Sequence, residues 1–210
     1  MKNRTLIWGA SVLLYAFFFC WYTNLSGPMV EEEISFYIER FKSTGMSADK
    51  LAGIRQFMEQ DTGDDFMMAN VLDLRDVPRQ VGDVQPGEGS EETMKRYMSF
   101  MFPALLSRAC HPVIYGKAVF HALDMEGIDA GNWSAAAMFR YRSRRDLVAI
   151  ASDPAFASAH QYKIAALEKT IAYPIDTMIN LGDPRFFIAL ILLVVSLSLQ
   201  LALNKPVQTR

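Results

Sequence analysis

Residues 156–170, FASAHQYKIAALEKT, are predicted to form a helix with a histidine on an apolar face. One face of this helix carries four residues spaced four, three and four apart: Phe156, His160, Lys163 and Leu167. The imidazole of His160 could act as a proton shuttle or a ligand in a pocket between helix and sheet. It could equally be a core residue that is hydrogen-bonded to a backbone carbonyl or a carboxylate. Because Lys163 lies on the same face as His160, we expect this face to lie near the solvent-exposed edge of the core.

Three other polar side chains are candidates for a ligand pocket. Asn70 lies inside the apolar run FMMANVLDL at 66–74, and a buried amide needs hydrogen-bonding partners, so it is either a structural tie or a ligand contact. Arg140 suits either a carboxylate ligand or a salt bridge at an interface, because a buried guanidinium needs a partner. Tyr97 either faces the pocket or packs in the core. The predicted ligand pocket therefore consists of Asn70, Tyr97, Arg140 and His160.

The histidines and cysteines predict neither a metal site nor a disulfide. His111 and His121 are ten residues apart on a predicted strand, which separates them by about 33 Å at about 3.3 Å per residue, too far to share a metal. Cys20 lies in an apolar end segment and Cys110 is alone in the middle of the chain. The sequence also lacks a nucleophile elbow, a P-loop and a dinucleotide-binding fingerprint. We therefore predict no metal and no cofactor, and we assign no catalytic residue.

The two ends of the chain are strongly apolar. The 210 residues carry a net charge of only −2, so no basic surface indicates nucleic-acid binding. Residues 5–22 and 186–203 contain no charged side chain, and each run of 18 residues is near the shortest that spans a hydrocarbon core of about 30 Å. The N-terminal run is not followed by a small-residue cleavage site. The sequence therefore predicts two uncleaved transmembrane helices on either side of a polar middle.

Charges near the two apolar segments predict their orientation. The short tails carry four basic residues: Lys2, Arg4, Lys205 and Arg210. Within 15 residues on the inner sides of the two segments only Arg185 is basic, and the acidic run 31–33 opposes it. Basic residues are enriched on the cytoplasmic side of membrane helices. We therefore expect an inner- or plasma-membrane protein with both termini in the cytoplasm and a periplasmic or extracytoplasmic central domain.

The middle of the chain is predicted to be an α+β domain. Hydrophobic spacing, capping residues and Gly or Pro breakers predict helices at 28–43, after Ser47, after Ser90, at 144–151 and from 154, and strands at 66–74, 111–123, 133–142 and 170–176. From 66 onward this order is βαββαβ, the ferredoxin-like plan with helices on one sheet face. The predicted boundaries are an anchor at 1–27, a helical stalk at 28–60, the domain at 61–178 and a second anchor at 179–210.

From about residue 48 to 176 the chain resembles an uncharacterised family of small ferredoxin-like proteins of unknown function. The matching pieces are MANVLDLRD around Asn70, Y-M-x-x-x-x-P-x-L from Tyr97 to Leu105, Trp133, F-R-Y at 139–141, and DPAF…H…K-x-A-A-L at 153–167. Members of this family pair as dimeric α/β barrels, so the resemblance implies a homodimer in which two sheets face one another. Relatives by fold include small monooxygenases and isomerases.

Two classes of function agree with these features. The first is a non-catalytic accessory or scaffolding component of a membrane assembly, whose partners are the lipid bilayer, a second copy and further membrane proteins. The second is a membrane-tethered binder of a small ligand, or a cofactor-independent monooxygenase- or isomerase-like enzyme, that uses the domain cavity. The binder or enzyme requires a closed pocket in which at least two of the candidate polar groups converge within hydrogen-bond reach. The scaffold requires instead an exposed apolar patch beyond the dimer face, which we expect on the helices at 29–60.

Overall fold

A computed structural model describes residues 2–127 and 131–204 of the chain, with side chains from Arg4 onward. It divides into two compact units, one of residues up to 23 together with those from 178 onward, and one of residues 24–177. The basic residues Lys205 and Arg210, which bear on the predicted orientation, lie outside the described residues, as does the side chain of Lys2.

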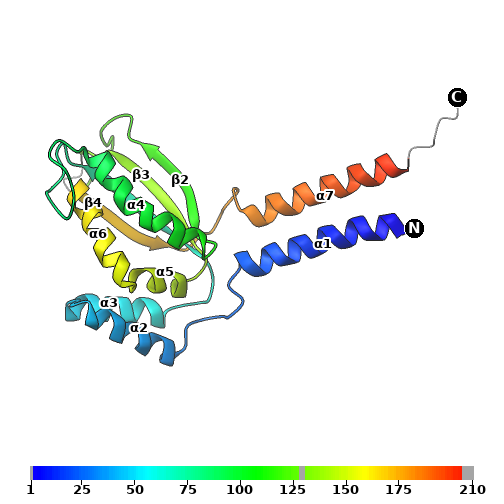
Figure 1. Ribbon diagram of the computed structural model, residues 1–210, viewed down its shortest axis with the longest axis horizontal. Helices are drawn as coiled ribbons and strands as arrows, with labels where there is room; N and C mark the ends of the chain where they lie inside the picture. The colour runs from blue at the N-terminus through cyan, green and yellow to red at the C-terminus, as the bar shows by residue number, and fades with distance from the viewer. Residues whose placement is uncertain (1, 128–130, 205–210) are drawn as a thin grey trace. The chain divides into compact units, whose positions relative to one another are not determined.

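The helices and strands follow the predicted order (Figure 1). The helices are α1 (Lys2–Tyr22), α2 (Glu31–Ser43), α3 (Ala48–Glu59), α4 (Ser90–Leu106), α5 (Arg144–Ala151), α6 (Pro154–Ala166) and α7 (Pro184–Leu203). The strands are β1 (Phe66–Leu74), β2 (His111–Lys117), β3 (Ala135–Tyr141) and β4 (Leu167–Ile175).

The sheet confirms the predicted ferredoxin-like α+β fold. Its four strands lie in the order β2-β3-β1-β4, and every neighbouring pair is antiparallel. The helices α4 and α6 lie side by side over one face of the sheet (Figure 1). The strand predicted last in the sequence is an edge strand, as expected. The helices therefore cover one sheet face, where a core forms.

Side-chain caps fix the starts of α5 and α6, as the sequence predicts. Ser143 Oγ accepts a hydrogen bond from the Asp146 backbone N at 3.1 Å. Asp153 Oδ1 accepts one from the Ala155 N at 2.9 Å. Each oxygen satisfies an N–H group that has no partner within its own helix. The cap at Asp153 therefore fixes the residue at which α6, the helix that carries His160, begins.

The start of α4 lies one position earlier than the predicted cap. Gly89 is the N-cap, and its carbonyl accepts from the backbone N of Glu92 and Thr93. The loop before the helix is held to it by Glu88, whose carboxylate accepts from Arg96 Nε and Nη2 at 2.9 and 2.8 Å. This pair of hydrogen bonds lowers the pKa of Glu88 to about 2.

The predicted helix at 156–170 is too long. The helix ends at Ala166, and Leu167 opens β4, where it pairs with Leu74 of β1. The carbonyls of Ala165 and Ala166 accept hydrogen bonds from the loop after β1 instead of from a further helical turn. Leu167 therefore leaves the face that Phe156, His160 and Lys163 share, and the fourth strand begins three residues before its predicted start at 170.

The second predicted strand is also too long. It ends at Lys117, whereas the apolar composition predicts a strand as far as 123. Beyond Lys117 the strand has no regular ladder partner, because β3 starts only at Ala135. Val119, Phe120 and Leu123 are exposed in the connecting loop. His111 thus lies on the strand and His121 in the exposed loop.

The helices at 28–60 belong to the same compact unit as the sheet. Phe41 of α2 and Met58 of α3 are buried, and they form a second core cluster with Val148 of α5. We expected this segment to form a stalk between membrane and domain, but in the structure it packs on α5.

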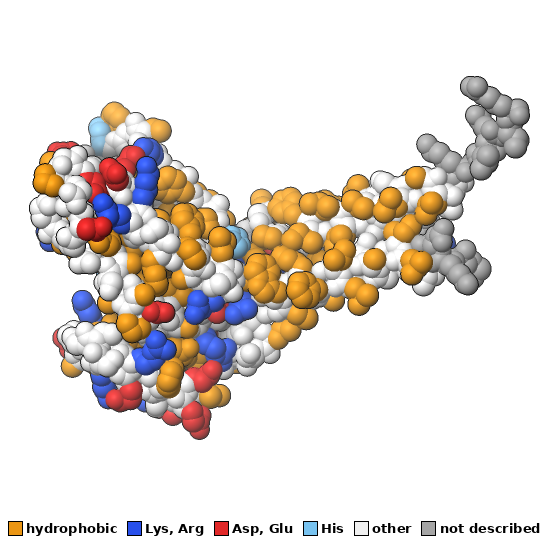
Figure 2. All heavy atoms as spheres, viewed as in Figure 1, with side chains coloured by type: hydrophobic (Ala, Val, Ile, Leu, Met, Phe, Trp, Pro, Cys, Tyr) orange, Lys and Arg blue, Asp and Glu red, His pale blue; other side chains and the backbone are white. Residues whose placement is uncertain are grey.

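The other unit consists of the two apolar helices α1 and α7. Both are long and apolar enough to cross a membrane, over Arg4–Tyr22 and Pro184–Leu203. Figure 2 shows apolar side chains along the visible surface of these helices.

Two hydrogen bonds join α1 to α7. Trp8 Nε1 donates to Gln200 Oε1 at 2.8 Å. The hydroxyls of Ser11 and Ser196 lie 2.7 Å apart, and Ser196 Oγ also donates to the Leu192 carbonyl. From the first contact to the second, the position moves forward along α1, from residue 8 to 11, and backward along α7, from residue 200 to 196. The two helices are therefore antiparallel. Gln200 thus has a partner helix within its own chain.

Candidate functional site

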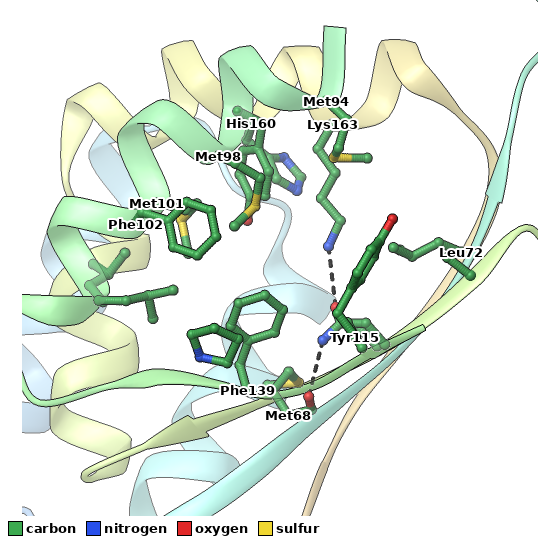
Figure 3. Close-up of a pocket in the computed structure, with 18 of the residues that line it drawn as sticks. Met68, Leu72, Met94, Met98, Met101, Phe102, Tyr115, Phe139, His160 and Lys163 are labelled. Carbon is green, nitrogen blue, oxygen red and sulfur yellow. Dashed lines mark hydrogen bonds between the residues drawn. The ribbon is translucent and has the colours of Figure 1, made fainter. Parts of the chain in front are cut away.

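A cavity of about 520 Å³ lies between the sheet and the helices above it. Its floor comes from alternate residues of β1 and β3, and its roof from α4 and α6, with α5 closing one side (Figure 3). The volume falls within the range of about 300–1,000 Å³ that is typical of small-molecule sites.

Small residues around Asn70 leave this space open. In the sheet register Asn70 is paired with Ala137 of β3 and Ala172 of β4, and all three line the cavity. Neighbouring side chains on paired strands point to the same face. The two alanines do not reach the helices, so a hollow remains between the sheet and the helices.

The rest of the lining is almost entirely apolar. From α4 come four large side chains that Figure 3 shows facing the hollow: Met94, Met98, Met101 and Phe102. Met68 and Phe139 lie across from them on the sheet. Methionine side chains are unbranched and polarisable, so they adapt to ligands of different shape.

Lys163 extends from α6 across the cavity to β1 (Figure 3). Its Nζ donates to Asn70 Oδ1 at 3.4 Å, a long hydrogen bond, and lies 5.7 Å from the centre of the Tyr97 ring. Asn70 Nδ2 in turn donates to the Met68 carbonyl at 3.1 Å. Burial lowers the pKa of Lys163, because apolar surroundings disfavour the charged ammonium.

His160 lies one turn before Lys163 and lines the same cavity. Its ring stacks on Phe156 with centroids 5.0 Å apart and meets the edge of Tyr97 at 6.1 Å. Burial, and then the positive charges of Lys163 and Lys50, lower the pKa of His160. Within the described part of the chain the imidazole has no hydrogen bond to a carbonyl or carboxylate, so ring stacking holds it in place.

Tyr97 also lines the cavity, from α4. The side chain is buried, and burial raises the pKa of its phenol. Asn70, Tyr97 and His160 thus line one cavity with Lys163, which is hydrogen-bonded to Asn70. In the described part of the chain no hydrogen bond joins the three candidate side chains to one another.

Arg140 does not line the cavity. It alternates with Phe139 and Tyr141 along β3, so its side chain leaves from the opposite sheet face. Its guanidinium is buried, donates to the Ala109 carbonyl at 2.9 Å, and lies 2.6 Å from Asp65 Oδ2. The structure therefore gives Arg140 a salt bridge within the chain, which was predicted as an interface contact or a ligand contact.

Lys163 is a polar cavity residue that the predicted pocket did not include, and Glu91 and Lys95 are two others. A lysine at helical spacing from an apolar stripe is usually at the solvent edge, and Lys163 is indeed half-buried. The available signal was its spacing of three residues from His160 and seven from Phe156.

The described residues contain no group of three or more His, Cys, Asp or Glu side chains that could hold a metal ion.

Comparisons with known proteins support the fold. No family model matches the chain, and no curated protein does. A protein of unknown function from Rhodopseudomonas palustris is 19% identical with a TM-score of 0.50, over 64% of this chain and 96% of its own. A structure of its methylated form is 18% identical with a TM-score of 0.52, and the alignment covers 66% of this chain and 96% of that one.

Two further solved structures align with lower TM-scores. A mutant of a cofactor-independent oxygenase from Streptomyces nogalater is 13% identical with a TM-score of 0.36, over 57% of this chain and 99% of its own. A dimeric protein of unknown function and ferredoxin-like fold from Bacteroides fragilis is 16% identical with a TM-score of 0.32, over 54% of this chain and 96% of its own. The strand order and the helices that cover one sheet face define a ferredoxin-like domain, and two helices of the chain are apolar enough to cross a membrane.

Proposed function

We propose that this protein is a membrane-anchored binder of a small, mostly apolar molecule, which it holds in the cavity between the sheet and α4 and α6. The observation that carries the proposal is the cavity of about 520 Å³, in which Lys163, Asn70 and Tyr97 converge within an apolar lining. Ligand sites typically combine apolar walls with a few polar groups in this way. The convergence favours a binder over a purely scaffolding role.

The two apolar helices support the proposed anchoring in a bilayer. Because of the antiparallel contacts Trp8–Gln200 and Ser11–Ser196, the start of α1 and the end of α7 lie at the same end of the pair. With the basic tails, this arrangement supports both termini in the cytoplasm and the domain outside it.

We also propose that a second copy covers the open sheet face. One row across all four strands on this face is apolar: Ile114, Met138, Ala69 and Tyr173. Ile114 and Tyr173 are 58% and 49% exposed, which is unfavourable for apolar side chains in water. Tyr173→Lys should therefore convert a dimer into a monomer in native mass spectrometry of the full chain, whereas Ala157→Lys on exposed α6 surface should not.

The binding proposal is tested by what the full chain carries after purification in mild detergent from its host. Solvent extracts should contain a small molecule at a fixed ratio to protein. Ala137→Phe should abolish it, because the ring fills the space above Asn70, whereas Ala157→Leu on the exposed surface of α6 should retain it. Other proteins that co-purify stoichiometrically, with no small molecule present, would contradict the proposal and support the accessory role.

A further inference from the structure

We propose that the ligand of this cavity is an amphipathic anion, with an apolar body and one carboxylate that contacts the Lys163 ammonium. The inference rests on the proposed function, because it names the chemical class of the molecule that the cavity holds. It follows from the position of Lys163, whose side chain reaches across a cavity with a mostly apolar lining.

The ammonium of Lys163 has only neutral neighbours inside the cavity. Its Nζ contacts the Asn70 amide at 3.4 Å and faces the ring of Tyr97 at 5.7 Å. Among the residues that the structure describes, no carboxylate forms an ion pair with it. A cation in apolar surroundings is costly unless an opposite charge compensates it. A carboxylate from a ligand would supply that charge.

The one carboxylate among the described lining residues, Glu91, already has an ion-pair partner. Glu91 lines the cavity from the exposed first turn of α4, and its Oε1 lies 2.6 Å from Lys117 Nζ. Lys95, one turn further along α4, adds a second positive charge to the exposed lining. The described cavity lining therefore carries an excess of positive charge, which favours an anion over a cation.

Asn70 is placed to contact the same carboxylate. Its Oδ1 accepts from Lys163, and one N–H of Nδ2 donates to the Met68 carbonyl. An amide nitrogen carries two N–H groups, so a second donor remains for a ligand oxygen. Burial lowers the pKa of Lys163, and an anion beside Nζ would raise it again, so binding and protonation would reinforce one another.

The remaining wall suits the apolar body of such a molecule. Met98 and Met101 on the helix side face Met68 and Phe139 on the sheet side (Figure 3). These side chains present no charge and adapt in shape. The cavity thus combines the Lys163 ammonium beside Asn70 with an apolar wall, which is the pattern that an amphipathic monocarboxylate requires.

Three matched probes on one aromatic frame test the charge of the ligand. The full chain in zwitterionic nanodiscs is titrated at neutral pH with 1-naphthaleneacetate, its uncharged amide, and the 1-naphthylmethylammonium cation, with empty nanodiscs as the blank. We expect the carboxylate to bind about tenfold more tightly than the amide, the factor that one charged hydrogen bond supplies. The cation should bind most weakly.

Substitutions at Lys163 assign the preference to this side chain. Lys163→Met should lose the preference for the carboxylate and leave the affinity for the amide nearly unchanged, since the methionine keeps the length and the apolar wall. Lys163→Arg should retain the preference. Lys42→Met removes an exposed lysine outside the cavity lining and should behave as the wild type, which separates a local contact from a change in net charge.

The outcomes distinguish this inference from the function on which it rests. Equal binding of the carboxylate and the amide, or a preference that survives Lys163→Met, would overturn the anionic ligand and leave the cavity as a binding site. If none of the three probes binds, the proposed function fails, and the inference fails with it.

Discussion

Lys163 Nζ lies 3.4 Å from Asn70 Oδ1, and the two residues are 93 positions apart in the chain. The contact joins α6 to the middle of β1 across a cavity that is otherwise almost entirely apolar. A lysine and an asparagine in these surroundings each lose hydration. Such an arrangement costs stability in the empty domain, which makes its effect measurable without any ligand.

Replacing Lys163 by methionine should stabilise the ligand-free domain. Burial lowers the pKa of Lys163, so at neutral pH the folded domain bears the cost of a desolvated ammonium. We expect Lys163→Met to raise the free energy of unfolding by roughly 0.5–2 kcal/mol, the range that a single stabilising substitution commonly gives. Urea unfolding of the full chain in detergent, followed by circular dichroism, measures the change.

The gain from Lys163→Met should shrink as the pH rises through the lowered pKa toward the ordinary lysine value of about 10.4. In this range the wild-type side chain loses its proton in the folded state first, so its penalty disappears. A loss of stability in Lys163→Met at neutral pH would show that the lysine contributes to the fold.

Mild acid should destabilise the domain through His160. Burial and the nearby Lys163 and Lys50 lower its pKa, so below about pH 6.5 the unfolded chain binds a proton that the folded chain resists. Stability therefore falls with pH from about 6.5 to the folded pKa, and the full loss persists below it. His160→Gln should flatten this part of the unfolding curve, whereas His121→Gln in the exposed loop should leave it unchanged.

Breaking the ion pair between Asp65 and Arg140 should destabilise the sheet without affecting the cavity. Arg140 is buried, and Asp65 Oδ2 lies 2.6 Å from its guanidinium. Asp65→Ala should lower the free energy of unfolding by about 3 kcal/mol, the lower end of the cost of leaving one member of a buried pair. The control Asp64→Ala, at an exposed neighbouring position, should change it by no more than about 0.5 kcal/mol.

Probe binding separates a structural role of this ion pair from a role in the site. Because Arg140 does not line the cavity, Asp65→Ala should leave the affinity for 1-naphthaleneacetate unchanged under conditions in which the domain remains folded. A selective loss of the carboxylate probe would instead place Arg140 in ligand binding.

Paired cysteines test the contact between the two apolar helices. The hydroxyls of Ser11 and Ser196 lie 2.7 Å apart, so Ser11→Cys with Ser196→Cys should form a disulfide within one chain, in a background where Cys20 and Cys110 are replaced by serine. Gel mobility before and after reduction reports the bond.

The control for this cross-link pairs Ser11→Cys with Ser198→Cys. Position 198 is two residues further along α7 and lies about 200° around the helix. The control should cross-link poorly. Equal cross-linking of both pairs would contradict the packing of α1 against α7 seen in the structure.

Local patterns in the sequence determined the order of elements and hence the fold. Apolar runs such as 66–74 predicted strands, and Ser143 and Asp153 predicted helix starts, because caps and side-chain alternation depend on near neighbours in the chain. The two apolar ends were also evident, since length and lack of charge are properties of a segment alone.

Only the tertiary structure decided which polar residues meet. The helix α6 ends before Leu167 because this residue pairs with Leu74 of β1 in the sheet. No local sequence pattern shows that pairing with a distant strand replaces a further helical turn. In the sequence, Arg140 and Asn70 are both polar residues on apolar strands. The strand register places Asn70 between Ala137 and Ala172 on the cavity side of the sheet. Arg140 lies on the other side, where it forms an ion pair with Asp65. Lys163 became part of the cavity because these alanines leave a hollow within reach of its long side chain. The size of that hollow depends on residues from all four strands and from α4, α5 and α6, and they come together only when the chain folds.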